Sequence, residues 1–264
     1  MKKAILNHSG GMDSSCLLIS LLAGGYSVKT LSFFYGQKHS FELGKSLELV
    51  TFLAKLGHKV ERTEIDLSSA FKGLYSSLLE GNVEVPEGHY SQGNMVETVV
   101  PNRNAIMSSI SYAHALSLSH SISQDVSIFM GIHAGDHAIY PDCRPEFREK
   151  IEEAFKLGNW GSERVSFVAP FLKMDKTDIL RGCLEDTKKM NLDFDQVMSM
   201  TSTSYNVNSK GEASGRTGSD IERIEAFLNI GRVDPINYVG GWDEASIYAK
   251  HTIKWYKENS KNIF

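Results

Sequence analysis

The sequence is poor in cysteine and has no run of apolar residues long enough to cross a membrane. Its 264 residues include three cysteines, Cys16, Cys143 and Cys183, which are far apart, odd in number and never in a CxxC pair. This usage argues against a disulfide framework and is typical of the reducing cytoplasm, where we expect the protein to reside. No stretch approaches the roughly 18 apolar residues of a membrane span, so we expect no membrane association. The chain enters an apolar segment directly after residues 1–3, which predicts no signal peptide.

Basic charge is not in excess either. The chain has 28 Lys and Arg against 32 Asp and Glu, for a net charge of −4 and a pI of about 6.1. A dedicated nucleic-acid-binding protein usually carries a basic face, so we expect no direct nucleic-acid partner. The nine histidines show no HExxH or comparable metal spacing. A hydrophobic fraction of 41% and a charged fraction of 23% are ordinary for a globular enzyme.

The most informative segment that is present is a glycine-rich turn near the N-terminus. It consists of Ser9, Gly10, Gly11, Met12, Asp13, Ser14 and Ser15, and we predict that these residues bind an anionic ligand. Apolar residues 4–6 before it predict a buried strand, and apolar residues 16–23 after it predict a helix. The glycines let the backbone approach a ligand, and free amides at a helix start form a donor site for an anion. The serines add hydroxyl donors, and Asp13 can bind a magnesium ion that phosphates share.

Strands and helices alternate through the first 190 residues. Further strands are predicted at residues 28–34, 59–65 and 126–132. Helices are predicted at residues 39–56, 104–118, 144–157 and 176–190. This alternation, with short links marked by glycine, predicts an α/β fold with a doubly wound parallel sheet, in which ligands bind at the carboxyl ends of the strands.

Two further regions complete the predicted organisation. Residues 68–95 are aperiodic and rich in Gly, Ser and Glu, which predicts a long loop over the site. We assign residues 1–190 to an α/β domain that carries the glycine turn and residues 191–264 to a small helical and loop appendage packed on it. Within the appendage, residues 221–228 and 247–257 predict helices.

Motifs along the chain resemble those of one protein family. The glycine turn resembles the pyrophosphate loop (SGGxDS) of the ATP pyrophosphatase superfamily. Later segments are similar to motifs of the QueC family, the 7-cyano-7-deazaguanine synthases; they are Tyr35-Gly36-Gln37-Lys38-His39 with Glu42, Val100-Pro101-Asn102-Arg103-Asn104, residues 131–136, residues 140–147, Lys176-Thr177 and residues 231–238. The matches occur in family order over nearly the whole chain. The resemblance implies an adenine nucleotide α-hydrolase-like (HUP) fold and a homodimer.

The resemblance also implies a chemistry. QueC proteins use ATP to adenylate the carboxylate of 7-carboxy-7-deazaguanine, ammonia then gives the amide, and a second activation dehydrates the amide to the nitrile. ATP and Mg²⁺ are therefore the expected cofactors, and Asp13, Arg103 and Lys176 are the expected catalytic residues, which place magnesium and neutralise phosphate charge. The expected substrate-binding residues are Gln37, His39, Asn104, His133, Asp136, Tyr140, Asp142, Arg144 and Phe147.

Local spacing alone leaves other roles open for several of these residues. Arg103 could begin a helix, Lys176 could lie on a solvated surface, and Asp142 could belong to a turn. With the resemblance, we expect Asp142 to bind the amidine face of the purine-like ring. Cys143 has no base partner at a recognisable spacing, and we expect a small buried thiol there.

The sequence departs from the family at its zinc site. The family carries C…CGxCxxC before an arginine and an apolar helix. Anchored on Arg223, the four cysteine positions correspond to Ser204, Ser214, Thr217 and Asp220. Serine and threonine hydroxyls stay protonated at neutral pH and bind zinc weakly. We therefore predict no structural zinc and expect hydrogen bonds or a partner to hold this segment.

Three functional interpretations remain open. The leading one is an ATP-dependent, AMP- and pyrophosphate-forming ligase that passes the deazaguanine acyl group to ammonia, in queuosine biosynthesis, or to an amine of a partner protein, as in the anti-phage (CBASS-type) operons where divergent QueC-like proteins occur. Another pyrophosphatase-loop activity, such as tRNA thiolation or glutamine-dependent amidotransfer, is disfavoured because paired catalytic cysteines and a glutaminase domain are missing. The third is a non-catalytic sensor of a nucleotide or deazapurine. The intact glycine turn with Asp13 favours an enzyme.

Overall fold

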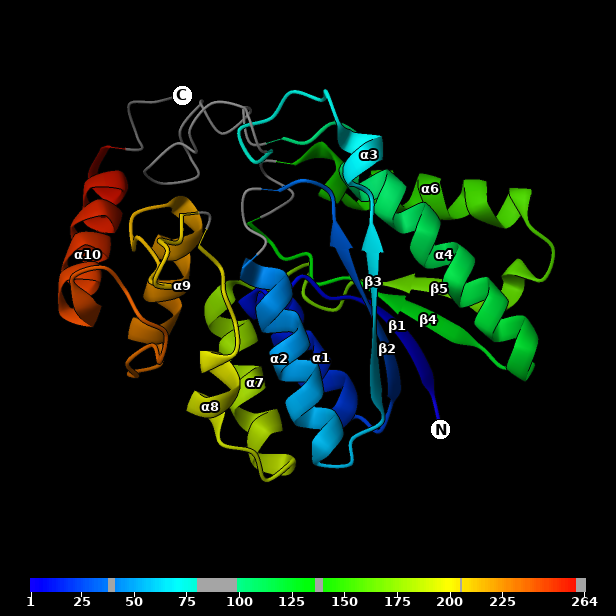
Figure 1. Cartoon of the computed structure of the whole chain (residues 1–264), viewed down its shortest axis with the longest axis horizontal. Helices are drawn as coiled ribbons and strands as arrows, with labels where there is room; N and C mark the ends of the chain where they lie inside the picture. Colours follow the sequence, from blue (N-terminus) through cyan, green and yellow to red (C-terminus); the bar gives the residue numbers. More distant parts are fainter. Residues whose placement is uncertain (38–40, 80–98, 136–139, 205, 260–264) are drawn as a thin grey trace.

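The computed structural model describes residues 1–37, 41–79, 99–135, 140–204 and 206–259 (Figure 1). Within these residues, five parallel strands form one sheet in the order β3-β2-β1-β4-β5. The strands are β1 (Lys3–Asn7), β2 (Ser27–Phe34), β3 (Val60–Asp66), β4 (Val126–Phe129) and β5 (Val165–Val168). The predicted α/β fold with a doubly wound parallel sheet is confirmed. The strand order reverses between β1 and β4, which is where such sheets bind ligands.

Helices cover both faces of the sheet (Figure 1). One face packs against α1 (Met12–Ala23), α2 (Phe41–Lys55) and α7 (Lys176–Lys189), and the other packs against α4 (Arg103–Ile122) and α6 (Pro145–Gly158). Strand β1 shows why: Ala4 and Leu6 join the core with α1, while Ile5 joins the core with α4. Successive side chains of a strand point to opposite faces, so the apolar residues 4–6 of β1 predict helices on both faces of the sheet.

Short elements were not predicted because their sequences are too brief for periodicity to show. They are the strand β5 and the helices α3 (Ser68–Phe71), η2 (Pro141–Cys143), η3 (Ser162–Arg164) and α8 (Phe194–Ser199). The prediction of one long loop over residues 68–95 is wrong at its start, where α3 forms. Residues 80–98 of that segment lie outside the described residues.

The C-terminal part of the chain adds α9 (Gly218–Asn229) and α10 (Gly241–Asn259), which lie beyond α7 in Figure 1. Helix α9 has two apolar faces, since Ile221 and Ile224 pack with α10 while Ala226 and Phe227 join the main core. The predicted boundary at residue 190 stays a prediction. Among the described residues, no helix is long and apolar enough to cross a membrane.

Candidate functional site

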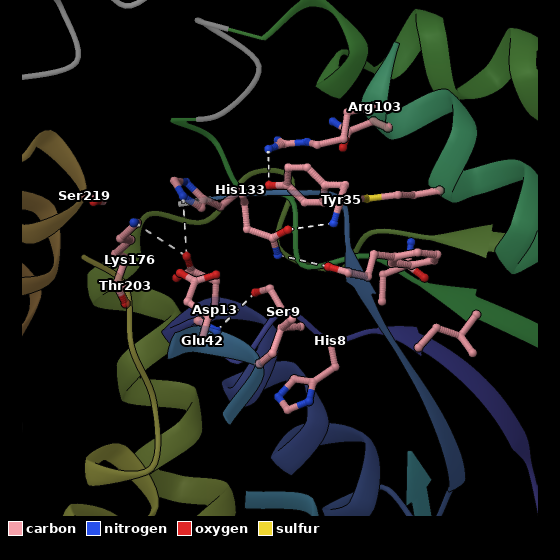
Figure 2. A pocket seen from close by; sticks show the side chains of 18 of the residues that line it. His8, Ser9, Asp13, Tyr35, Glu42, Arg103, His133, Lys176, Thr203 and Ser219 are labelled. Carbon is pink, nitrogen blue, oxygen red and sulfur yellow. Dashed lines mark hydrogen bonds and ion pairs between the residues drawn. The ribbon is translucent and has the colours of Figure 1, made fainter. Parts of the chain in front are cut away.

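A cavity of about 260 Å³ opens at the carboxyl ends of β1 and β2, beside the point where the strand order reverses (Figure 2). Its lining comes from both predicted parts of the chain. The first part supplies Ser9, Gly11 and Asp13 of the glycine turn together with Tyr35, Gln37, Glu42, Arg103, Asn104, His133 and Lys176. The appendage supplies Thr203, Ser219 and Glu222, none of which was predicted to face the site.

The glycine turn depends on a close approach of two backbones. Gly10 has a φ of 93°, and a Cβ built there would collide with the carbonyl oxygen of Glu42 and lie 2.9 Å from the Ser46 nitrogen. A side chain at this position would therefore push α2 away from the turn. On its other side, the Gly10 carbonyl accepts a hydrogen bond from the Ser202 N–H at 2.9 Å. The turn is thus held between α2 and the segment that leads to the appendage.

Asp13 and Lys176 face each other in the cavity (Figure 2). Asp13 Oδ2 lies 3.6 Å from Lys176 Nζ and 3.8 Å from His133 Nε2. Lys176 Nζ is closer to Glu222 Oε2, at 3.0 Å. The second oxygen of Asp13, Oδ1, is buried without a hydrogen-bond partner. A carboxylate oxygen without a hydrogen-bond partner has free lone pairs that can bind Mg²⁺. Asp13 therefore fits the role of magnesium ligand that was predicted for it.

Local capping places Lys176 at this position. The residue before it, Asp175, caps α7 and accepts a hydrogen bond from the Asp178 N–H at 2.8 Å. Lys176 is therefore the first residue of α7, and its side chain is only 8% exposed. The alternative of a solvated surface lysine, which local spacing left open, does not match this burial.

The carboxyl group of Glu42 also faces the cavity. Burial raises its pKa from 4.5 to about 8, against the opposing effect of the positive charges of Arg103 and Lys176. At neutral pH this side chain is mostly protonated and can donate a hydrogen bond. The family motif contained Glu42, yet nothing in the sequence indicated its protonation, which depends on the surrounding cavity wall.

Arg103 lies on a different wall of the cavity from Lys176 (Figure 2). It is the first residue of α4, and its Nη1 donates to Tyr35 Oη at 3.1 Å. Gln37 supports the same wall, because its Oε1 accepts from the Tyr35 N–H at 2.7 Å and its Nε2 donates to the Phe33 carbonyl at 3.1 Å. Both ends of the Gln37 amide are therefore used by the end of β2.

His133 is oriented by the turn after β4. Its Nδ1 accepts a hydrogen bond from the Gly135 N–H at 3.0 Å, so the neutral imidazole carries its proton on Nε2, which faces Asp13. Two other predicted substrate-binding residues, His39 and Asp136, lie outside the described residues.

The Tyr-Pro-Asp-Cys segment at residues 140–143 lies beside the cavity lining. Asp142 Oδ2 accepts from the Asn104 N–H at 3.4 Å, in the first turn of α4, and Asn104 Nδ2 donates to Cys143 Sγ at 3.3 Å. Among the described residues that line the cavity, Asn104 is present, whereas Tyr140, Asp142, Arg144 and Phe147 are not. Asp142 thus supports a helix N-terminus, and its role in binding the ring stays a prediction. Cys143 is buried, as expected of a small packed thiol.

A buried polar network lies under the glycine turn. The His8 ring shares hydrogen bonds with Ser15 Oγ at 3.1 Å through Nε2 and with Ser46 Oγ at 2.9 Å through Nδ1. Burial, with a further contribution from Arg62, lowers the pKa of His8 to about 3. Arg62 Nε in turn donates to Ser46 Oγ at 3.2 Å. His8 is therefore neutral and ties the turn to α1 and α2.

The four positions that correspond to the family's zinc cysteines lie together in the structure. Ser204 Oγ, Ser214 Oγ and Thr217 Oγ1 lie 3.1, 2.9 and 2.8 Å from Oδ2 of Asp220. Ser214 and Thr217 donate to Oδ2, whereas the single Ser204 proton is shared between the Asn206 carbonyl, at 2.9 Å, and Oδ2. The N–H groups of Arg216 and Thr217 donate to the same oxygen at 3.2 and 3.1 Å. We call Ser204, Ser214, Arg216, Thr217 and Asp220 the Asp220 cluster. Burial raises the pKa of Asp220, against the opposing effect of these hydrogen bonds.

This donor set does not fit zinc. Three of the four side chains at the cysteine positions are hydroxyls within hydrogen-bond distance of the fourth, and a protonated hydroxyl is a poor zinc ligand. No group of three or more His, Cys, Asp or Glu in the described ranges is placed to hold a metal ion. The hydrogen bonds expected to hold the segment are present, and the absence of zinc stays a prediction.

Comparison with known proteins connects this geometry to a family. The family model described as "Queuosine biosynthesis protein QueC" matches residues 3–231. A 7-cyano-7-deazaguanine synthase from Marinomonas sp. is 40% identical over 90% of this chain and 98% of its own length. The 7-cyano-7-deazaguanine synthase 1 of Colwellia psychrerythraea is 42% identical over 90% of this chain and 99% of its own length.

Likeness to solved structures is weaker. The NMN synthetase from Francisella tularensis aligns over 94% of this chain and 83% of its own, with 13% identity and a TM-score of 0.42. That value is too low to bear on the assignment, which rests on the sequence relationships. By the extent of the family match and the identity to these synthases, the chain belongs to the QueC family.

Proposed function

We propose that this protein is an ATP-dependent ligase that adenylates the carboxylate of 7-carboxy-7-deazaguanine and passes the acyl group to nitrogen. The observation that supports this most is the convergence of the glycine turn, Asp13, Arg103 and Lys176 on one cavity. The chain also spans nearly the full length of relatives named 7-cyano-7-deazaguanine synthase.

The reaction needs activation because a carboxylate is a poor acyl donor. In the first step, a carboxylate oxygen of the substrate bonds to the α-phosphorus of ATP, and the bond to the bridging oxygen breaks, releasing pyrophosphate. In the second step, a nitrogen nucleophile attacks the acyl carbon and AMP leaves with the electron pair. Ammonia would give the amide, whose further activation and dehydration would give the nitrile.

The residues of the cavity divide this work. The amides of the glycine turn and the Ser9 hydroxyl would hold the β- and γ-phosphates, and Lys176 and Arg103 would neutralise charge from two walls. Ser14 and Ser15, also predicted to bind the anionic ligand, do not line the cavity, and Ser15 Oγ instead contacts His8. Glu222 holds Lys176 in place at 3.0 Å. Asp13 would hold Mg²⁺ through its unpartnered oxygen, and the ion would supply further neutralisation of phosphate charge.

Pyrophosphate release from ATP and magnesium, with and without 7-carboxy-7-deazaguanine, tests the first step. We expect release that depends on the deazaguanine in ammonium-free buffer, and nitrile on addition of ammonium. Deazaguanine-dependent release with adenylate or hydrolysis alone would instead favour an amine of a partner protein as the acceptor. No release under any condition would contradict the ligase and favour a nucleotide or deazapurine sensor.

A further inference from the structure

One hydroxyl of the appendage lies in the wall of the cavity. Thr203 lines the cavity on the same side as Lys176 and is 8% exposed (Figure 2). It belongs to the short segment that contacts the glycine turn, since the neighbouring Ser202 N–H donates to the Gly10 carbonyl at 2.9 Å. Thr203 is therefore held close to the predicted phosphate site by the backbone of Ser202 as well as by its own side chain.

The direction of the Thr203 hydroxyl proton follows from its partners. Thr203 Oγ1 accepts from the Met12 N–H at 3.4 Å and from Arg223 Nη1 at 3.1 Å. A backbone N–H and a guanidinium can only donate, and a hydroxyl has two lone pairs and one proton. Both lone pairs are thus engaged, and the proton must point away from both donors. Within the described ranges, no protein acceptor takes it.

Arg223 always donates to Thr203 Oγ1, because its guanidinium stays protonated. Its guanidinium is fully buried and paired with Asp234, from Nε to Oδ2 at 2.6 Å and from Nη2 to Oδ1 at 2.9 Å. Burial opposes its charge while the neighbouring Asp234 carboxylate raises its pKa, so Arg223 stays protonated. It cannot reach the cavity, but its hydrogen bond strengthens Thr203 as a donor.

Thr201 provides an internal comparison. Arg223 Nη1 donates to Thr201 Oγ1 as well, at 2.8 Å. Thr201, however, gives its own proton to the Met198 carbonyl at 2.7 Å and does not line the cavity. Two threonines on the same guanidinium therefore differ in one respect, since only Thr203 has a proton left for a ligand.

We propose that Thr203 is a ligand of the terminal phosphates of the nucleotide, with Arg223 as the positioning residue that fixes its proton. A hydroxyl restricted to donation, beside the N-terminus of α1 and near Lys176, suits an anion rich in acceptors. The inference rests on the proposed nucleotide site and adds to it a residue from the part of the chain that corresponds to the family's zinc segment.

Calorimetric binding of ATP, pyrophosphate and AMP, each with magnesium, tests the assignment in four full-length proteins. These are the wild type, Thr203→Val, Thr203→Ser and the matched control Thr201→Val. We expect Thr203→Val to weaken ATP and pyrophosphate about 10- to 100-fold and to leave AMP within about twofold. Thr203→Ser and Thr201→Val should bind ATP within about threefold of the wild type, because the donor is kept or was never directed at the ligand.

Several results would overturn the inference. They are unchanged ATP binding by Thr203→Val, equal weakening of ATP and AMP, or an equal effect of Thr201→Val. If Thr203→Val fails to fold, Thr203→Cys replaces it, because a thiol is a weak donor and should bind ATP less tightly than Thr203→Ser. A wild type that binds no ATP would contradict the proposed function itself, which separates that failure from a failure of Thr203 alone.

Discussion

The cavity and the Asp220 cluster are both polar and partly or wholly buried, yet they differ in how their carboxylates are partnered. In the cavity, Asp13 Oδ2 lies 3.6 Å from Lys176 Nζ and 3.8 Å from His133 Nε2, and its Oδ1 has no hydrogen bond. In the cluster, Asp220 receives five hydrogen bonds on one oxygen, all within 3.2 Å. The other Asp220 oxygen accepts none, in keeping with the raised pKa of this carboxyl.

This difference separates a ligand site from a structural link. Buried polar groups cost free energy when they are unpaired, so loosely paired charges around a cavity indicate that a ligand completes them. In the Asp220 cluster, Oδ2 receives its hydrogen bonds from the chain itself, at the positions where the family carries zinc cysteines, and only Oδ1 is left without a partner. Three short hydroxyl donors on one carboxylate oxygen join the same parts of the chain that a metal would join.

The two regions are mechanically connected. Helix α9 starts in the cluster, where Thr217 and Asp220 form a capping box, and its first turn carries Ser219 and Glu222 to the cavity wall. Glu222 then contacts Lys176 at 3.0 Å. The cluster therefore stabilises the helix whose Glu222 contacts Lys176, the lysine proposed to neutralise phosphate charge.

The largest effect is expected at Asp13, on pyrophosphate release. Asp13→Asn should lower deazaguanine-dependent pyrophosphate release by at least about 100-fold, because the magnesium ligand and the partner of Lys176 lose their charge. Thermal unfolding should stay within a few degrees of the wild type. Asp178→Asn, on the exposed side of the first turn of α7, serves as the control and should turn over normally. Normal turnover by Asp13→Asn would contradict the assignment of this residue.

The next largest effect is expected at Asp220, on the free energy of unfolding. Asp220→Ala removes the acceptor of five donors and should lower the free energy of unfolding by about 3 kcal/mol in urea titrations. Asp220→Asn keeps a carbonyl oxygen for those donors and should lose less than about 1.5 kcal/mol. Equal losses in the two variants would show that the cluster does not act through this oxygen.

A smaller effect, on pH dependence, is expected under the glycine turn. The pKa of His8 is 6.5 when unfolded and about 3 when folded, so the unfolded chain binds more protons between these values. The contribution is fully present above pH 6.5 and is lost as pH falls, by about 2 kcal/mol at pH 5.

Unfolding free energies of His8→Gln, measured from pH 7 to pH 5, check this value. The loss should be about 2 kcal/mol smaller in His8→Gln than in the wild type and unchanged in His251→Gln, whose side chain is exposed. An identical pH dependence in His8→Gln and the wild type would show that His8 is not the responsible group.

The smallest effect is expected from metal removal. Treatment of the wild type with a chelator should move the unfolding temperature by less than about 1 °C, and purified protein should hold well under one equivalent of zinc. The matched variant restores cysteine at the four positions of the family's zinc ligands, with Ser204→Cys, Ser214→Cys, Thr217→Cys and Asp220→Cys. It should bind about one zinc and become sensitive to the chelator. Stoichiometric zinc in the wild type would overturn the interpretation of the Asp220 cluster.

Much of the fold and the centre of the site could be predicted from the sequence. Local periodicity predicts the apolar runs of β1, β2 and α1. The glycine turn indicates a phosphate site because its residues are adjacent in the chain. Asp13, Arg103 and Lys176 were predicted through motifs and do meet at the cavity. Family membership followed from the same motifs and was confirmed by the comparisons.

Tertiary structure alone decided the rest. Thr203 and Glu222 face the site only because the appendage folds back onto the glycine turn, and Gln37 and Asp142 have their polar groups engaged by nearby backbone. Similarly, the hydroxyls of Ser204, Ser214 and Thr217 share one partner only because the fold places Asp220 between them. Local pattern encodes which residues form a helix or a turn, whereas the partner of a hydroxyl or carboxylate depends on contacts between distant segments, which no spacing along the chain records.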